Sequence, residues 1–448
     1  MRVLALVDGE HYPEVTRWGI QSARSVGHEV LAAVFLGGLE KIRSEGLPDL
    51  GVPVIDGRGE LIDVVGRVLD QVRPEAVLDL SDEPIVGYRE RMEIAAVSLA
   101  RGVPYVGSDF RLDPPIWGPV LPAPTLAVIG TGKRTGKTAI AGEVARTAAR
   151  MDLKPIIVAM GRGGPPEPEV AEAGTTGVEA LVEKARRGRH AASDFLEDAV
   201  TTGQTTIGAR RCGGGLAGAP FVTNVVEAGH QAAARDPDVL ILEGSGASIP
   251  PIPWDAGILV VPAGVLEEYV AGYLGPFRIL LSDLVVVTMM SGPGSDPQKP
   301  FAFGSHVHRL NREARFVVTD FEPVPLGEVQ GKSVFFTTTA PEGVASHQVA
   351  SLEERAGCRV VGWSSHLADR AALGRDLEAA PQYDVLLTEL KAAAVDVASE
   401  SALKRGAGVV FVDNRASSVA GQPALSNLLE ETIELARARY EQRREKQG

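Results

Sequence analysis

The sequence predicts an α/β protein with mostly parallel sheets, in which a P-loop NTPase core follows an N-terminal Rossmann-like domain. Short apolar runs alternate with helix-length segments along the 448 residues, a pattern typical of parallel strands covered by helices. One such run leads into the loop "GTGKRTGKT", which opens a helix-like segment, as a phosphate-binding loop does. A chain of this length is expected to form two or three domains.

The first unit, residues 1–120, is the predicted Rossmann-like domain. Residues 112–124 hold five prolines, which suits a rigid linker and puts the first boundary near residue 120. Strands of this unit are expected at residues 3–7, 30–38, 76–80 and 103–107.

The second unit, residues 121–330, is the predicted nucleotide-binding and catalytic domain, and residues 331–448 form a third α/β stretch. Periodicity leaves open whether this third stretch is a separate domain or continues the core sheet. Its end repeats apolar residues at Leu429, Ile433, Ala436 and Tyr440, which predicts an amphipathic helix. After the opening "TLAVIG" run, strands are expected at residues 155–160, 238–244, 257–262, 284–288, 333–341, 359–365, 384–390 and 408–414.

Composition limits the classes of partner. The formal net charge of −13 argues against a nucleic acid or an anionic membrane, because either would be repelled. Two cysteines without metal-ligand spacing favour a reducing compartment. The chain begins with a strand-like run, and no apolar run approaches the roughly 20 residues of a membrane helix. We therefore expect a cytoplasmic protein, and the net charge still allows a local cationic pocket for an anionic substrate.

The glycine-rich loop has the residue types that hold the phosphates of a nucleotide. Glycines let backbone N–H groups turn toward phosphate, and the helix N-terminus adds the positive end of its dipole. Lys137 is expected to reach the β- and γ-phosphates, and the Thr138 hydroxyl to coordinate Mg²⁺. The usual first glycine of the motif falls on Thr131, with Gly130 one residue earlier. The predicted nucleotide-binding residues are Gly130, Thr131, Gly132, Thr135, Gly136, Lys137 and Thr138, and the predicted catalytic cations are Lys137, Lys133 and Arg134.

A second metal ligand is expected at the end of another apolar strand. In "DVLILEGSG" four apolar residues lead to Glu243 and then to a glycine-rich turn. We expect Glu243 and Thr138 to hold Mg²⁺, with a simple strand-capping role for Glu243 as the alternative. The "GT" opening, the "GKT" end and the "EGSG" turn look like those of dethiobiotin synthetase and related P-loop enzymes, where a glutamate holds the metal.

Further basic and glycine-rich segments predict a small, strongly anionic acceptor, because arginine forks and bare backbone amides bind phosphates or carboxylates. Arg162 follows the second strand of the core unit, and Arg210 and Arg211 precede the glycines of "CGGG". A third cluster, Arg186 to Arg189, is as compatible with a solvated surface as with a ligand. The predicted acceptor-binding residues in these segments are Arg162, Arg210, Arg211, Gly213 and Gly214.

Five segments together resemble the cyclic 2,3-diphosphoglycerate synthetase family: "LALVDGEHYPEV", "GTGKRTGKTAIAGEVAR", "ARRCGGGLAG", "ILEGSGASIPP" and "TELKAAAVDVA". The first and last are the distinctive ones, and the resemblance runs from Leu4 to about Asn414. It implies an ATP-dependent ligase that joins the two phosphates of 2,3-diphosphoglycerate into a cyclic phosphoanhydride and releases ADP and phosphate. It further implies a homodimer and a possible K⁺ requirement. Lys391, in the last segment, is a further candidate substrate contact or a solvated helix residue.

Two other functions fit the P-loop. One is an ATP-dependent carboxylase or ligase like dethiobiotin synthetase, and the other is a regulatory NTPase that switches partners. The N-terminal loop "DGEHYP" stays open as well. Asp8, Glu10 and His11 lie where open parallel sheets bind ligands, which favours a regulatory, metal-linked or lid role, and a loop-capping role is equally compatible.

Overall fold

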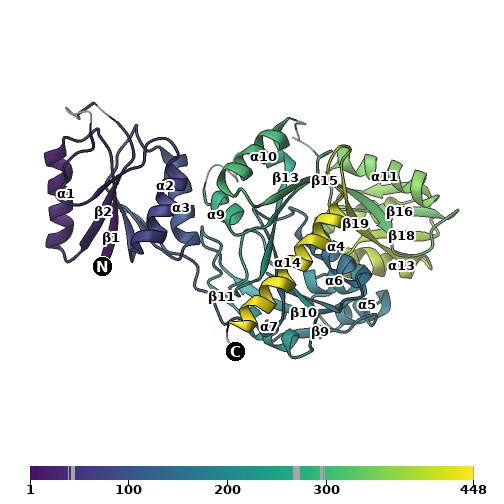
Figure 1. Ribbon diagram of the computed structural model, residues 1–448. Coiled ribbons are helices and arrows are strands. Elements are labelled where there is room, and N and C mark those ends of the chain that lie inside the picture. The colour runs from purple at the N-terminus through teal and green to yellow at the C-terminus, as the bar shows by residue number, and fades with distance from the viewer. Residues whose placement is uncertain (39, 42–45, 266–272, 293–295, 297, 447–448) are drawn as a thin grey trace.

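The computed structural model describes residues 1–38, 40–41, 46–265, 273–292, 296 and 298–446 (Figure 1). A smaller N-terminal lobe stands beside a larger one that holds the rest of the chain. Each strand predicted from the apolar runs is present, several of them shorter than expected. The predicted α/β class with mostly parallel sheets is therefore confirmed.

The N-terminal lobe is a doubly wound sheet with helices on both faces. Its strand order is β3-β2-β1-β4-β5-β6, parallel except for the last pair. On β1, Val3 and Ala5 pack with α1, while Leu4 and Leu6 pack with α2 and α3 on the other face. The elements are β1 (Arg2–Val7), α1 (Pro13–Ser25), β2 (Glu29–Phe35), β3 (Val54–Asp56), α2 (Leu61–Val72), β4 (Ala76–Asp79), α3 (Tyr88–Ala100), β5 (Tyr105–Val106) and β6 (Arg111–Leu112).

The larger lobe is built on a 13-stranded sheet, ordered β11-β10-β8-β12-β7-β13-β14-β15-β19-β18-β16-β17 with β9 beside β10. The run from β10 to β15 is parallel throughout, so the carboxyl ends of these strands share one edge. The strands of this half are β7 (Thr125–Gly130), β8 (Pro155–Gly161), β9 (Glu169–Ala171), β10 (Thr205–Cys212), β11 (Val222–Thr223), β12 (Val239–Glu243), β13 (Ala256–Pro262), β14 (Leu284–Thr288) and β15 (Arg315–Pro325).

The C-terminal stretch continues this sheet, which answers the question that periodicity left open. Strand β15 pairs in parallel with β14 along its first half and antiparallel with β19 along its second, from Thr319–Ser418 to Pro325–Val412. Strands from before and after residue 330 thus belong to one sheet. The division of the chain into three units stays a prediction. The elements here are β16 (Ser333–Thr337), α11 (Glu342–Ala356), β17 (Arg359–Ser364), α12 (Arg370–Ala379), β18 (Val385–Glu389), the π-helix η2 (Ala394–Ser399), α13 (Glu400–Lys404) and β19 (Gly408–Ser418).

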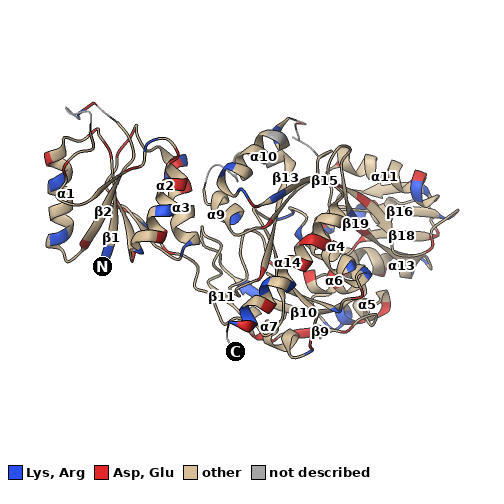
Figure 2. Ribbon diagram, viewed as in Figure 1, with Lys and Arg blue, Asp and Glu red and all other residues tan. Residues whose placement is uncertain are grey.

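Helices cover both faces of the P-loop half of the sheet. Helix α4, whose apolar face of Ile140, Val144 and Ala148 is buried, lies on one face of the sheet. Helices α7, α9 and α10 lie on the other. Charged side chains follow the helices and loops, whereas the strands are largely uncharged (Figure 2). The helices are α4 (Lys137–Arg150), α5 (Val178–Arg186), α6 (Asp194–Thr202), α7 (Val225–Ala233), α9 (Gly275–Leu280) and α10 (Lys299–Leu310).

The last helix, α14 (Leu425–Glu445), returns from the C-terminal strands to the P-loop half (Figure 1). The predicted positions Leu429, Ile433 and Ala436 are buried in one apolar cluster with α4. Near its end, Arg443 donates from Nε and Nη2 to the two carboxylate oxygens of Asp255, at 3.1 and 3.0 Å. The C-terminal helix is therefore part of the nucleotide-domain core.

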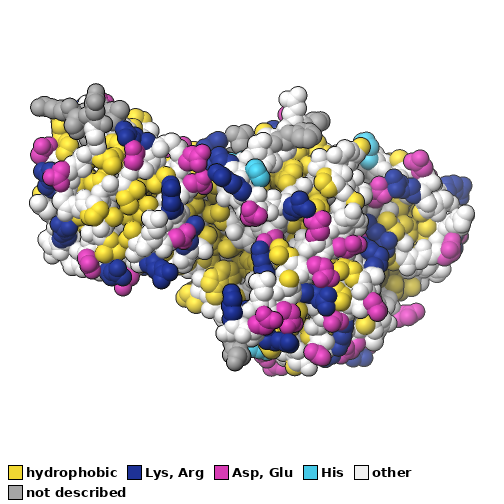
Figure 3. Space-filling view, in the orientation of Figure 1, with side chains coloured by type: hydrophobic (Ala, Val, Ile, Leu, Met, Phe, Trp, Pro, Cys, Tyr) yellow, Lys and Arg dark blue, Asp and Glu magenta, His cyan; other side chains and the backbone are white. Residues whose placement is uncertain are grey.

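The two lobes meet at a waist where basic and acidic side chains gather (Figure 3). Arg309 of α10 pairs with Glu93 of α3, and Arg312 donates to Asp63 of α2 at 2.9 Å. Behind these pairs α9 packs against α3 within one apolar cluster that includes Phe277. Among the described helices none is long and apolar enough to cross a membrane.

Replacing Leu429 by alanine tests the place of α14 in the core. The side chain is fully buried, so Leu429→Ala should lower the free energy of unfolding by about 2–4 kcal/mol through lost transfer and a residual cavity. Urea denaturation followed by circular dichroism measures it. The neighbouring exposed residue gives the control, Glu430→Ala, which should change stability little. Equal effects of the two substitutions would contradict the packing described here.

Candidate active site

The loops that follow β7, β8, β10 and β12 meet at the shared carboxyl edge of the large sheet, where open α/β sheets bind ligands. The loop after β7 is the predicted phosphate loop. The other three carry Arg162, the "CGGG" segment and the "EGSG" turn. Parallel pairing therefore brings together segments that are up to about a hundred residues apart in sequence.

The phosphate loop has a conformation that requires glycine at Gly136. Its φ is +93°, and a Cβ there would lie 2.5 Å from the ring of Phe321 on β15. Thr288 of β14 fixes the loop further by donating to the Thr135 carbonyl at 2.7 Å. Lys137 is buried, and its Nζ donates to the Gly132 carbonyl at 2.7 Å and to the Thr135 hydroxyl at 3.2 Å. Burial lowers the pKa of Lys137 to about 8.

Glu243 lies against the phosphate loop, as the sequence predicts. The Thr138 hydroxyl donates to Oε1 of Glu243 at 2.6 Å, and the carboxylate is buried at the end of β12. Its other oxygen, Oε2, is buried without a hydrogen-bond partner. Burial and the nearby Asp194 raise the pKa of Glu243 to about 7. A hydroxyl and a carboxylate with an unused oxygen are donors that suit Mg²⁺, so the residues present fit that ion.

Helix α6 adds acids that the sequence reasoning missed. Asp198 is fully buried next to Glu243, and neither of its carboxylate oxygens accepts a hydrogen bond from a donor group among the described residues. Burial and then the neighbouring Glu243 raise the pKa of Asp198 well above the usual value. Asp194, at the start of the helix, interacts electrostatically with Lys137 and Glu243. The spacing of these acids, i and i+4, was a signal that they share one helix face. In the sequence, the cluster Arg186 to Arg189 just before these acids is the more conspicuous feature.

Those basic residues lie on the surface, in agreement with the solvated alternative. Arg186, Arg187 and Arg189 are exposed. Arg186 lies 3.7 Å from Glu400 and Arg187 lies 2.9 Å from Glu183. Exposed pairs of this kind are ordinary surface ion pairs of small net value.

Arg210 and Arg211, both predicted to bind the acceptor, do not point to the same face of the sheet. They are consecutive residues of β10, a strand that the polar sequence concealed, so their side chains leave on opposite faces. Arg211 is buried and donates to the carbonyls of Gly213 and Ser245, both at 2.8 Å. Arg210 is exposed, and its Nε donates to the Gly164 carbonyl at 3.0 Å.

Arg162 and Arg211 converge instead. A Cβ added at Gly246 would lie 3.0 Å from Nη2 of Arg162 and 3.2 Å from Nη2 of Arg211, so both guanidinium groups lie beside the "EGSG" turn. Burial and then the neighbouring Arg162 lower the pKa of Arg211. Two guanidinium groups held side by side favour a shared anion between them.

The remaining predicted cations differ in their surroundings. Lys133 and Arg134 are exposed on the phosphate loop, and within the described residues their side chains make no hydrogen bond or ion pair. Lys391 follows β18, and its Nζ lies 3.2 Å from Oε1 of Glu197 on α6. Burial raises the pKa of Glu197 to about 8, against the lowering effect of Lys391. Lys391 thus joins the C-terminal strands to the helix that carries Asp194 and Asp198.

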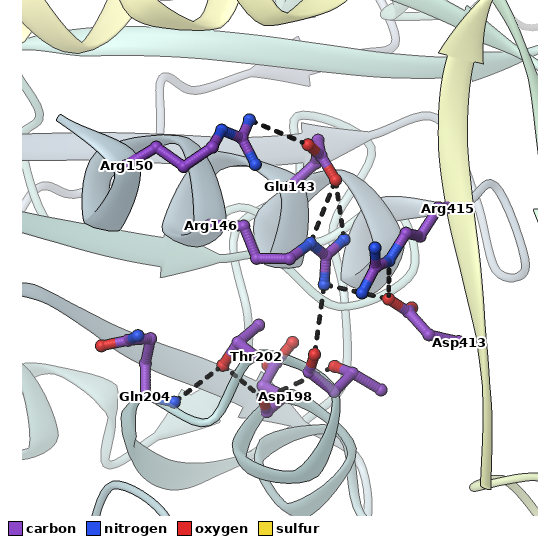
Figure 4. Close-up of polar contacts among 9 residues, drawn as sticks. Glu143, Arg146, Arg150, Asp198, Thr202, Gln204, Asp413 and Arg415 are labelled. Atoms are coloured by element: carbon purple, nitrogen blue, oxygen red, sulfur yellow. Dashed lines mark hydrogen bonds and ion pairs between the residues drawn. The ribbon is translucent and has the colours of Figure 1, made fainter. Parts of the chain in front are cut away.

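A second polar connection holds the phosphate-loop helix against the same elements (Figure 4). Arg146 of α4 donates to Oε2 of Glu143 from Nε at 3.1 Å and from Nη2 at 2.9 Å. Its Nη1 lies 3.0 Å from a carboxylate oxygen of Asp413 on β19 and 3.3 Å from the Thr201 carbonyl on α6. The picture shows Arg146 between these partners, so one side chain ties α4, α6 and β19 together.

In the N-terminal loop, the carboxylate of Asp8 accepts hydrogen bonds from its own loop and from the neighbouring one. Oδ1 of Asp8 accepts hydrogen bonds from the backbone N–H groups of Glu10 at 2.9 Å and His11 at 3.2 Å, and lies 2.9 Å from Nδ1 of His11. Oδ2 accepts from the N–H of Asp82 at 2.6 Å. These contacts agree with the loop-capping interpretation. In the part of the chain that the structure describes, no group of three or more His, Cys, Asp or Glu residues could hold a metal ion.

The fold and this edge define a P-loop enzyme whose nucleotide loop faces arginine-bearing loops. The chain belongs to the cyclic 2,3-diphosphoglycerate synthetase family. It matches the family's P-loop domain over residues 125–320, its N-terminal domain over 2–113 and its C-terminal domain over 325–415. The resemblance seen in the sequence is thereby confirmed.

Two curated relatives, both named cyclic 2,3-diphosphoglycerate synthetase, illustrate the extent of the similarity. The protein from Rubrobacter xylanophilus is 47% identical over 417 residues, which cover 92% of this chain and 94% of that protein. The protein from Methanothermobacter thermautotrophicus is 42% identical over 423 residues, which cover 92% and 91%. The similarity therefore extends over nearly all of both chains.

Replacing Gly136 by alanine tests the geometry of the phosphate loop. Gly136→Ala forces an alanine into the left-handed backbone region and brings its Cβ against Phe321. The affinity for a fluorescent ATP analogue should therefore fall by about tenfold or more. Gly203 offers the matched control, because its φ is +69° but a Cβ there meets nothing within 4 Å. Gly203→Ala should leave nucleotide affinity unchanged. Equal losses of affinity in the two variants would contradict a loop-specific effect.

Proposed function

We propose that this chain is an ATP-dependent ligase that closes 2,3-diphosphoglycerate into cyclic 2,3-diphosphoglycerate and releases ADP and phosphate. Membership of the synthetase family over almost the whole chain supports this activity. The observation in the structure that carries it is the position of Lys137 on the same sheet edge as Arg162 and Arg211. A nucleotide tail and a second anion can be bound next to each other there.

The chemistry demands such a site. The two phosphates of the substrate repel each other, and water would hydrolyse the product, so the enzyme must neutralise, orient and enclose them. We propose that an oxygen of one substrate phosphate attacks the γ-phosphorus of ATP, and the bond to ADP breaks. An oxygen of the other substrate phosphate then attacks the phosphorus that now carries the extra phosphoryl group. The anhydride ring forms, and inorganic phosphate leaves.

The residues divide into two groups in this scheme. Lys137 and the backbone N–H groups of residues 130–138 bind the triphosphate, and the exposed Lys133 and Arg134 are free to neutralise the transferring group. Arg162, Arg211 and the N–H groups of Gly213 and Gly214 bind the substrate phosphates. Arg210 lies on the other face of its strand, and Lys391 is held by Glu197, so both act through their neighbours.

Thr138 and Glu243 would hold the magnesium ion. The ion would supply charge neutralisation at the β- and γ-phosphates. The Thr138 hydroxyl donates to the carboxylate, which keeps both oxygen donors close together. A cation would compensate the buried carboxylate of Glu243, whose second oxygen accepts no hydrogen bond from a donor among the described residues.

The family membership favours this ligase over a dethiobiotin-synthetase-like carboxylase or a regulatory NTPase. A switch would hydrolyse nucleotide without a small acid, whereas this ligase should be stimulated by 2,3-diphosphoglycerate. A homodimer, a K⁺ requirement and a cytoplasmic location follow from the resemblance or the composition and stay predictions.

The activity and the role of Lys137 can be tested together. Protein, Mg-ATP and 2,3-diphosphoglycerate should give a new phosphoanhydride signal in ³¹P NMR, with one ADP per product. Lys137→Ala should reduce turnover by about 10²- to 10³-fold or more, because it removes the buried cation at the phosphates. Lys154 lies at the opposite edge of the sheet, so Lys154→Ala should be fully active. ATP-dependent product formation by Lys137→Ala at the wild-type rate would refute the assignment.

The metal assignment has its own test, which does not depend on turnover. Glu243→Gln should weaken Mn²⁺ binding in the presence of ADP by at least about tenfold, because a neutral amide replaces the carboxylate ligand. Electron paramagnetic resonance of free Mn²⁺ measures the affinity. Asp238 precedes the other end of β12, and Asp238→Asn should bind Mn²⁺ like the wild type. Unchanged affinity in Glu243→Gln would remove Glu243 from the metal site.

A further inference from the structure

Arg278 of α9 is a buried arginine that lies behind two loops of the candidate site. One is residues 213–218, the acceptor loop, and the other is the turn that follows β12. Arg278 is 5% exposed. Nη2 donates to the Ala247 carbonyl at 2.6 Å, and Nη1 donates to the Leu274 carbonyl at 2.9 Å. Both Nη atoms also lie 3.5 Å from the Leu216 carbonyl. The guanidinium group therefore contacts the loop after β10 and the turn after β12 at the same time.

No carboxylate balances this charge within the described residues. Among the described residues, each hydrogen bond of the side chain goes to a backbone carbonyl, and its Nε is buried without a partner. Burial lowers the pKa of Arg278 to about 10, so the group stays charged at neutral pH. A buried guanidinium group is costly to desolvate, and the contacts that the described residues make with it are all to backbone carbonyls. This indicates that its fork of hydrogen bonds serves a purpose that a neutral residue would not.

The two segments that Arg278 joins form one unit. Arg211 connects them from the nucleotide side, through Gly213 and Ser245. The N–H of Ile249 donates to the Gly218 carbonyl at 2.8 Å, and a Cβ on Gly218 would lie 2.8 Å from the Ile249 side chain. Because the turn begins directly after Glu243, the acceptor loop is held at a fixed place relative to the proposed metal ligand.

Helix α9 also connects this unit to the N-terminal lobe. It packs between α3 and the two loops, and its Phe277 lies in the same apolar cluster as Ile94 of α3 (Figure 1). Ala217 and Ile249 of the two loops belong to that cluster as well. The N-terminal lobe therefore supports the helix that supports the acceptor loop.

We propose that Arg278 is a positioning residue for the acceptor, which holds residues 213–218 against the turn after Glu243 and adds positive charge beneath the bound polyanion. This inference rests on the proposed function. Arginine is required because its planar fork reaches several carbonyls at once, whereas an ammonium group is a single point of charge. The side chain acts through the loop and does not touch the substrate.

Arg278→Lys and Arg278→Gln test the proposal. Arg278→Lys should raise the KM for 2,3-diphosphoglycerate by about 10- to 100-fold while the KM for ATP changes by less than about twofold, since only the acceptor loop is displaced. Arg278→Gln, which also loses the charge, should raise the KM for 2,3-diphosphoglycerate further than Arg278→Lys does. The control is Arg315→Lys, which alters an exposed ion pair with Glu431 at the opposite edge of the sheet and should change neither KM. Thermal unfolding verifies that each variant is folded.

Isothermal titration of 2,3-diphosphoglycerate, with a non-hydrolysable ATP analogue present, separates this inference from the proposed function. A wild-type protein that binds the acid without forming the cyclic product refutes the function, and the affinity ratio between wild type and Arg278→Lys still tests the positioning role. Folded variants with unchanged affinity and KM for the acid, or with equal rises in both KM values, overturn the role of Arg278. A wild type that does not bind the acid overturns both.

Discussion

The hydrogen bond from Thr138 to Glu243 is the contact on which the site depends. It joins the first turn of α4 to the end of β12, the strand that pairs directly with β7. Since both strands run parallel, their ends lie at one level, and a short hydroxyl can reach a carboxylate 105 residues away in sequence. The phosphate loop, the proposed metal ligands and the turn that carries the acceptor loop are all fixed relative to this contact.

Around it lie two buried acids with raised pKa values, Glu243 and Asp198, and a buried lysine with a lowered pKa, Lys137. Among the described residues no donor reaches Asp198 or the second oxygen of Glu243, and Lys137 contacts neutral groups of its own loop. Such an arrangement is costly in an isolated protein, and it becomes favourable when a cation binds the acids and an anion binds the lysine. The magnesium nucleotide that we propose would bring both at once. This explains how a chain with a net charge of −13 can build a site for anions.

The sequence predicts where a residue lies when its position is set by a short stretch of chain. The order strand, loop, helix places Lys137 and Thr138, and the order strand, acid, glycine places Glu243. The sequence does not identify Asp198 as a site residue, because tertiary packing decides which face of α6 meets the site. The sequence does not separate Arg210 from Arg211, because the polar residues of β10 give no apolar run that would indicate a strand. The burial of Arg278 and the return of α14 depend on contacts far along the chain, which no local pattern reports.

The two flanking regions then have a common physical role. On one side, Arg146 and Lys391 tie α4 and α6 to the C-terminal strands. On the other, α9 connects the acceptor loop to the N-terminal lobe. A reaction that brings two phosphates of one small molecule together gains rate from groups that are already in place, because any loosening lets the repelling charges separate. Supports on both sides of the P-loop half therefore follow from the demand for fixed geometry, and they give the outer regions a function without contact to the substrate.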